Sequence, residues 1–149
     1  SSYLVAQGKE HLKNILECTD VLIYNREEAE TLVGAGTIDS LLKRSFYLIP
    51  GVVVITDGKN GAYCYDGKLI YKVKGGPVKI LETTGAGDSF AATFVAALIM
   101  EKTINTALKW ATVNAQSVIT HYGAKNQLLD IKEIEARLKK SDLDVKARF

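Results

Sequence analysis

The sequence predicts one α/β domain built on a mostly parallel β-sheet with an added β-hairpin. Two short apolar runs, Val21–Tyr24 and Val52–Thr56, have the composition of buried strands, and each belongs to a strand–helix unit. The pair Asp66-Gly67 separates two further extended segments and is typical of a hairpin turn. A chain of 149 residues is long enough to bury a core of its own.

Hydrophobic spacing and turn residues predict the remaining elements in order along the chain. Leu12, Ile15 and Leu16 share one face of an amphipathic helix within residues 9–18. Asn25 can cap the next helix, which ends at the glycines after Val33. The other expected elements are a helix at 38–45, strands at 62–65, 69–73 and 78–81, a buried helix opened by residues 82–88 and running to about residue 100, helices at 104–121 and from 130, and a loose tail at 141–149.

Composition and charge exclude several classes of protein. Hydrophobic residues make up 47% and charged residues 24%, which argues against disorder and against a coiled-coil rod. The net charge of +2 argues against a nucleic-acid polymer as partner. The longest apolar stretch, residues 90–100, is too short to cross a membrane. Two cysteines, Cys18 and Cys64, predict free thiols and a cytoplasmic location.

The segment Thr83-Thr84-Gly85-Ala86-Gly87-Asp88 carries the strongest chemical signal. Small residues at a strand-to-helix turn let backbone amides approach an anion, and the helix N-terminus adds partial positive charge. The spacing leaves two interpretations of Asp88 open. It is either an N-cap that stabilises the helix by about 1 kcal/mol, or a general base that takes a proton from an alcohol attacking phosphorus.

Residues 83–90, TTGAGDSF, resemble the C-terminal signature of the ribokinase-like (PfkB-type) carbohydrate kinases. Three further matches occur in the order typical of that family. Residues 25–28 (NREE) resemble its Asn-x-x-Glu motif, and residues 56–61 (TDGKNG) resemble its Thr-x-Gly-x-x-Gly nucleotide turn. Residues 111–124 are similar to its adenine-pocket helix and the loop that follows. The resemblance covers about residues 20–138.

The resemblance implies a three-layer α/β/α ribokinase-like fold, truncated at its N-terminal side. It also implies transfer of the γ-phosphate of ATP to a hydroxyl of a sugar or related small alcohol. Residues 1–149 would form the C-terminal nucleotide-binding and catalytic half, without the sugar-binding half and lid, so we expect the isolated chain to be inactive. Asp88 would be the general base, and the anion hole would be formed by the amides of Gly85, Ala86 and Gly87.

Further residues acquire roles from the same resemblance. Asn25 and Glu28 would organise Mg²⁺ through water, although alone they are more typical of a plain helix cap beside a solvated acid. The nucleotide itself would be contacted by Thr56, Gly58, Gly61, Asn114 and Gly123.

A monovalent cation site is the least regular part of the resemblance. Glu82 stands where the family commonly has Asp, and with Thr84 it would hold K⁺ behind the anion hole. Because Glu is one methylene longer, the site is either preserved, shifted or lost.

Other interpretations compete with the kinase. A nucleotide-binding or scaffold module without catalysis is the main alternative. The pair Gly34 and Gly36 follows a helix rather than a strand, which argues against a dinucleotide-binding fold, and the sequence contains no Gly-Lys-Ser/Thr of a Walker loop. A truncated sheet would have an exposed edge, which predicts self-association as a homodimer.

Overall fold

The computed structural model describes residues 5–122 and 127–149, which form two compact units. The first unit contains residues up to Gly58 together with Ala62–Lys72 and Ala147–Phe149. The second contains Lys59–Gly61 and Val73–Lys146.

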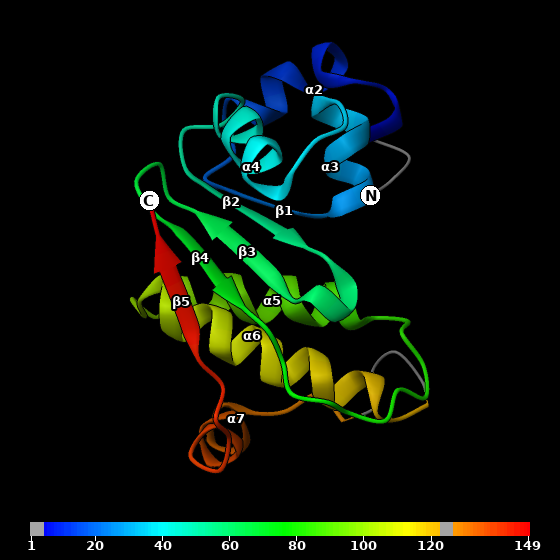
Figure 1. Ribbon diagram of the computed structural model, residues 1–149, viewed down its shortest axis with the longest axis vertical. Coiled ribbons are helices and arrows are strands. Elements are labelled where there is room, and N and C mark those ends of the chain that lie inside the picture. Colours follow the sequence, from blue (N-terminus) through cyan, green and yellow to red (C-terminus); the bar gives the residue numbers. More distant parts are fainter. Residues whose placement is uncertain (1–4, 123–126) are drawn as a thin grey trace. The chain divides into compact units, whose positions relative to one another are not determined.

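A five-stranded sheet confirms the predicted α/β class (Figure 1). The first two strands, β1 and β2, are parallel, whereas β2 and β3 are antiparallel, so the sheet is mixed. The hairpin expected at Asp66-Gly67 joins β3 to β4, and the Asp66 side chain accepts hydrogen bonds from the backbone N–H groups of Lys68 and Leu69. The strands lie in the order β1 (Val21–Asn25), β2 (Val52–Thr56), β3 (Ala62–Tyr65), β4 (Ile70–Val73) and β5 (Val145–Arg148).

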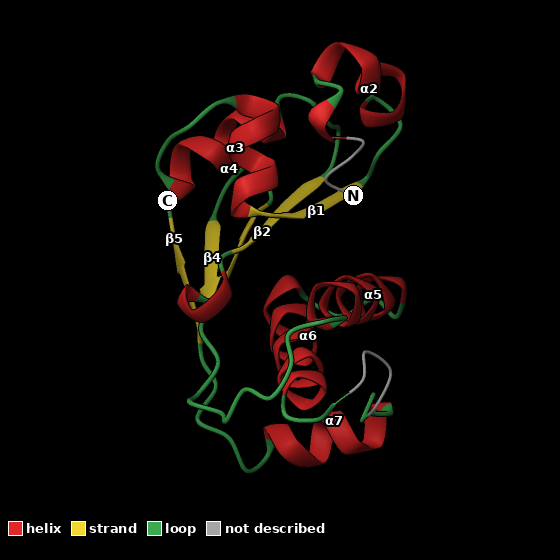
Figure 2. Ribbon diagram, turned by 90° about the vertical axis from the view of Figure 1, so that its right-hand side faces the viewer, coloured by secondary structure: helices red, strands yellow, loops and turns green. Residues whose placement is uncertain are grey.

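Among the described residues, the first unit also contains the helices α2 (Lys9–Leu16), α3 (Arg26–Val33) and α4 (Ile38–Phe46). Helices α3 and α4 pack against the first strands of the sheet (Figure 2). The core between them is formed by apolar side chains from every layer, including Leu12, Leu16, Ala29, Leu32, Leu41, Leu42, Val53 and Ile55. The predicted boundaries of β2 and α3 are confirmed, because each is set by a local signal: a run of β-branched residues and an Asn cap.

The second unit is built on the pair α5 (Ala86–Ile99) and α6 (Ile104–Ile119), with α7 (Ile131–Leu138) packed on α6 (Figure 2). Asp130 caps α7 in a capping box with Glu133, as the sequence predicts.

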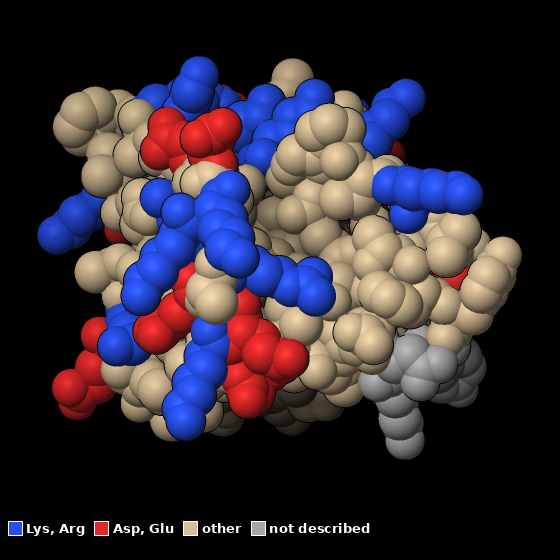
Figure 3. All heavy atoms as spheres, turned by 90° about the horizontal axis from the view of Figure 1, so that it is seen from below, with Lys and Arg blue, Asp and Glu red and all other residues tan. Residues whose placement is uncertain are grey.

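Figure 3, a view from below, shows acidic and basic side chains side by side rather than a continuous basic surface. Within the described residues, no helix has both the length and the apolar character to cross a membrane.

Two predicted features of the chain are wrong, and both depend on distant neighbours. Residues 78–81 are not a strand: the backbone N–H of Leu81 donates to the carbonyl of Ile119 at 2.9 Å, and Ile80 is 57% exposed. The tail differs from the loose segment expected, since residues 145–148 form β5 and the Arg148 guanidinium binds both Asp39 carboxylate oxygens at 2.5 Å.

The expected burial of two helices is only partly correct. In α5, Phe94 is fully buried but Ile99 is 77% exposed, so the helix is not covered on all sides within this chain. In α2, Leu12 and Leu16 enter the core, whereas Ile15 on the edge of the same face is 62% exposed. An apolar residue near the border of a helical stripe can point to either side of it, and spacing alone does not decide which.

Candidate active site

The turn before α5 begins the helix without a side-chain cap. Gly85 is the N-cap residue and adopts φ of +83°, in the left-handed region that favours glycine. Because glycine has no side chain, no capping side chain occupies the space in front of the first-turn amides. The backbone N–H of Ala86 donates to the carbonyl of Thr83 at 3.2 Å. Of the three amides predicted to bind an anion, that of Ala86 is therefore already used inside the turn.

Asp88 lies in the first turn of α5 and is exposed. The interpretation of Asp88 as an N-cap is wrong, because Gly85 is the N-cap and no side chain bonds to the helix end. A carboxylate in the first turn is still favourable for the helix, because it lies near the positive end of the dipole. Its exposure leaves it accessible to a reacting group.

Gly87 has no packing reason to be glycine. Its φ is not positive, and a Cβ built at this position meets no atom within 4 Å. The space beside its Cα is therefore open, and a backbone without a side chain is what close approach of an anion requires.

The motifs of the first unit meet at the carboxyl ends of β1 and β2. In the parallel pair, Asn25 at the end of β1 lies opposite Thr56 at the end of β2. Asn25 Oδ1 accepts a hydrogen bond from the Glu28 N–H at 2.8 Å, and Glu28 Oε2 accepts one from the Asn25 N–H at 3.0 Å. The predicted cap is thus confirmed as a capping box. Its oxygens are hard donors of the kind that suits Mg²⁺ and its water shell.

An ion pair that was not predicted links the same two motifs. Arg26 lies 3.6 Å from Asp57 Oδ2 and 3.1 Å from Glu30 Oε1. The hydrogen bond to Glu30 raises the pKa of the Arg26 side chain. Arg26 begins α3 and Asp57 begins the nucleotide turn, so the pair joins the start of the helix to the turn. The sequence does contain a signal for this ion pair: a basic residue directly follows one strand, and an acidic residue directly follows the next.

The two glycines of the predicted nucleotide turn differ in their surroundings. The 3₁₀ turn η1 (Gly58–Asn60) starts at Gly58, which has φ of +48° and open space around its Cα. Gly61 has φ of +100°, and a Cβ there would lie 2.0 Å from the carbonyl oxygen of Val73. Gly61 is therefore required by the packing of the protein itself.

Asn114 is buried and its amide is used within the second unit. Its Nδ2 donates to Thr93 Oγ1 at 2.8 Å, and its Oδ1 accepts from the backbone N–H of Leu129 at 3.0 Å. The residue thereby joins α5, α6 and the segment before α7. The geometry gives Asn114 a structural role, and the contact with adenine or ribose that the resemblance implies stays a prediction. Gly123 lies outside the described residues.

The residues expected to hold a monovalent cation follow one another in the segment before α5. Thr84 is exposed and Glu82 is half-buried. The backbone N–H of Glu82 lies 3.4 Å from the carbonyl oxygen of Ile119. In the described part of the chain, no three side chains of His, Cys, Asp or Glu converge as a metal site.

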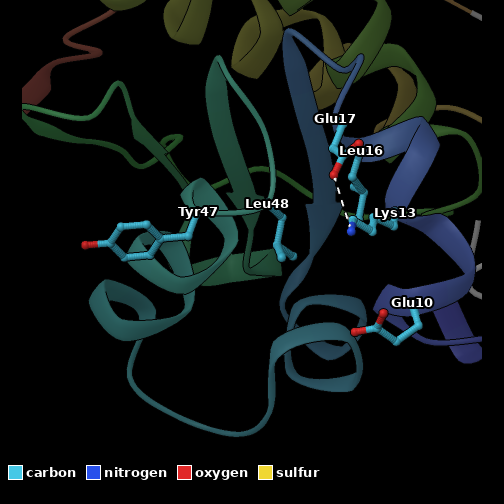
Figure 4. Close-up of a pocket in the computed structure, with 6 residues that line it drawn as sticks. All are labelled: Glu10, Lys13, Leu16, Glu17, Tyr47 and Leu48. Atoms are coloured by element: carbon cyan, nitrogen blue, oxygen red, sulfur yellow. Dashed lines mark ion pairs between the residues drawn. The ribbon is translucent and has the colours of Figure 1, made fainter.

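A cavity of about 260 Å³ lies in the first unit and contains none of the predicted site residues. Figure 4 shows Leu16 and Leu48 beside it, with an ion pair of 3.9 Å between Lys13 and Glu17. Glu10 and Tyr47 complete its lining. Its lining combines charged and apolar side chains and shares no residue with the turns described above, so the cavity is not part of the candidate site.

Comparison with known proteins decides the family. Residues 2–131 match the model of the pfkB family of carbohydrate kinases. The chain belongs to this family. The 5-dehydro-2-deoxygluconokinase of Halalkalibacterium halodurans is 33% identical over 132 residues, which are 86% of this chain and 40% of that protein. The ATP-dependent 6-phosphofructokinase of Thermoanaerobacterium thermosaccharolyticum is 28% identical over 129 residues, which are 87% of this chain and 40% of that protein.

Solved structures confirm the ribokinase-like fold of this pfkB-family chain. Ribokinase from Thermotoga maritima superimposes with a TM-score of 0.77 at 26% identity, covering 85% of this chain and 44% of that structure. A fructokinase from Vibrio cholerae, bound to fructose, ADP and a calcium ion, gives a TM-score of 0.76 at 29% identity, covering 86% and 44%. The chain spans about 40% of the length of the curated relatives that it matches.

Proposed function

We propose that this chain supplies the nucleotide-binding and catalytic part of an ATP-dependent carbohydrate kinase, acting on a hydroxyl of a sugar or related small alcohol. The observation that carries the proposal is the start of α5. There, a left-handed Gly85 without a cap, an open Gly87 and an exposed Asp88 occupy one helical turn. A structural turn alone needs neither the open glycine nor the exposed acid.

In the proposed reaction, the oxygen of the acceptor hydroxyl attacks the γ-phosphorus of ATP. Asp88 accepts the proton of that hydroxyl as the attack proceeds. The bond between that phosphorus and the bridging oxygen breaks, and ADP leaves with the electron pair. Charge on the transferring phosphoryl oxygens is stabilised by the amides of Gly85 and Gly87, each worth about 3 kcal/mol of barrier height. Donation by Ala86 as well requires the Thr83 carbonyl to give up its bond.

Asn25 and Glu28 fit a role in holding Mg²⁺ through water, because the capping box fixes one amide and one carboxylate group beside the end of β2. The metal ion would neutralise charge on the β- and γ-phosphates. Thr56 and Gly58 would lie along the nucleotide, and Gly61 would fix the end of its turn. Glu82 and Thr84 are proposed to hold K⁺.

The acceptor is proposed only as a class. The two relatives described above are named for different sugars, a deoxygluconate derivative and fructose 6-phosphate. The shared chemistry is a hydroxyl of a small carbohydrate. The chain covers less than half of each of these relatives.

The first test is calorimetric titration of the chain with Mg·ATP, alongside Asp88→Asn. Saturable binding with similar dissociation constants is expected for both, because Asp88 acts on the acceptor. A folded chain that does not bind Mg·ATP would contradict the proposal. The isolated chain is expected to transfer little or no phosphoryl group, so the rate comparison applies to any preparation with measurable transfer to a sugar. There the rate should be at least about 100-fold lower in Asp88→Asn. Equal measurable rates would instead favour the alternative of a nucleotide-binding module without catalysis by Asp88.

A further inference from the structure

The segment between β4 and the turn at residues 83–88 has a fixed course, although it has no regular secondary structure. We call this segment, residues 74–82, the strap; it runs beside α6 (Figure 1). At its start, Gly61 of the nucleotide turn packs directly on the carbonyl of Val73, since a Cβ on Gly61 would lie 2.0 Å from that oxygen. At its other end the strap leads straight into the turn before α5. The strap thus connects the two glycine turns of the second unit.

Hydrogen bonds at two places along the strap hold it on α6. Gln116 Nε2 donates to the carbonyl of Gly76 at 2.8 Å. Further along, the backbone N–H groups of Leu81 and Glu82 both approach the carbonyl oxygen of Ile119, at 2.9 and 3.4 Å. The last two turns of α6 therefore set where the strap ends, and with it where the turn of residues 83–88 begins.

The glycines of the strap show how closely Gln116 fits. A Cβ on Gly75 would lie 2.4 Å from Gln116 Nε2, so any other residue at this position displaces the Gln116 amide. The neighbouring Gly76 is different, because a Cβ there meets nothing within 4 Å. Glycine is needed at 75 for the hydrogen bond and is not needed at 76 for packing.

We propose that Gln116 is a positioning residue for the phosphate-binding turn. By holding the carbonyl of Gly76, it fixes the strap between the nucleotide turn at Gly61 and the anion-binding turn that ends in Asp88. A segment without regular hydrogen bonds samples many conformations unless it is tethered, and ordering it after ligand arrival weakens binding. The tether by Gln116 keeps both turns in place beforehand. This inference rests on the proposed binding of ATP.

The test compares four variants with the parent chain: Gln116→Ala, Gly75→Ala, the double variant, and Gly76→Ala as the matched control. Loss of one neutral hydrogen bond predicts a dissociation constant for Mg·ATP about five-fold higher in Gln116→Ala. Gly75→Ala should show the same loss, because its Cβ removes the same hydrogen bond. The double variant should bind no more weakly than either single variant, and Gly76→Ala should bind as the parent does.

Amide hydrogen exchange gives a second reading that is independent of ATP. The N–H groups of Leu81, Glu82 and Ala86 should exchange faster in Gln116→Ala and Gly75→Ala than in Gly76→Ala. Additive losses of affinity in the double variant, or equal loss in the Gly76 control, would overturn the proposal. If the parent chain binds no Mg·ATP, the proposed function fails. The exchange rates then still test whether Gln116 positions the turn, because unchanged protection at Ala86 would show that it does not.

Discussion

Substitution of Gly87 by alanine should move stability and nucleotide binding in opposite directions. The added Cβ meets no atom within 4 Å and the backbone is not in the left-handed region. Alanine in a helical turn is favoured over glycine by about 0.5–1 kcal/mol. For a chain of this size, that gain corresponds to a rise in melting temperature of about 1–4 °C. The protein should therefore become more stable.

The proposed anion would lie close to the Gly87 backbone, where the same methyl group would crowd it. A hydrogen bond to a charged group contributes about 2 kcal/mol, so the dissociation constant for Mg·ATP should rise about 30-fold. Thermal unfolding and calorimetric titration of one preparation measure both effects. Unchanged affinity in a stabilised Gly87→Ala protein would refute the argument that this turn binds phosphate.

Three further predictions concern stability, thiol reactivity and pH. Gly61→Ala should destabilise the protein by about 3 kcal/mol in urea unfolding, because positive φ and a close backbone carbonyl both oppose a side chain. Burial raises the pKa of the Cys64 thiol, so a maleimide at pH 8 should label only the exposed Cys18 until the chain unfolds. The hydrogen bond from Arg148 holds the pKa of Asp39 below its usual range, so the stabilisation is present above about pH 4 and is lost as the pH falls further.

Each of these has a result that would contradict it. Equal unfolding midpoints for Gly61→Ala and the parent would show that the turn can move away from β4. Two maleimides per native chain would mean that Cys64 is reachable. For the tail, the protection factors of the β5 amides, which correct for the intrinsic slowing of exchange in acid, should fall as the pH drops below about 4. Asp39→Asn should remove that dependence on pH. An identical pH profile in this variant would assign the effect to other groups.

Features set by neighbours in sequence could be predicted. The β-branched run of β2 and the Asn25 cap of α3 lie where the sequence places them, because their signals are contained within a few residues. The left-handed Gly85 could also be anticipated from small residues before an apolar helix. These features fix the local shape of the turns that carry predicted site residues in each unit.

Features set by distant partners could not be predicted. Residues 78–81 have the composition of a strand, yet their hydrogen bonds go to the end of α6. The tail becomes β5 because it pairs with the edge of β4 and because Arg148 binds Asp39. The place of Asn114 in a motif predicts a nucleotide contact, whereas its hydrogen bonds to Thr93 and Leu129 are visible only in the folded chain. Spacing identifies a polar residue but not the group that it contacts.

Asn25 is both the last residue of β1 and the cap of α3, so no connecting residue separates strand from helix. This leaves no room for insertion or deletion at that point. One added residue would shift Asn25 by about 3.3 Å relative to Thr56, and would turn the following helix by about 100°. Insertions and deletions should therefore be tolerated in the loops that precede α4 and β2, whereas the junction at Asn25 should keep its length.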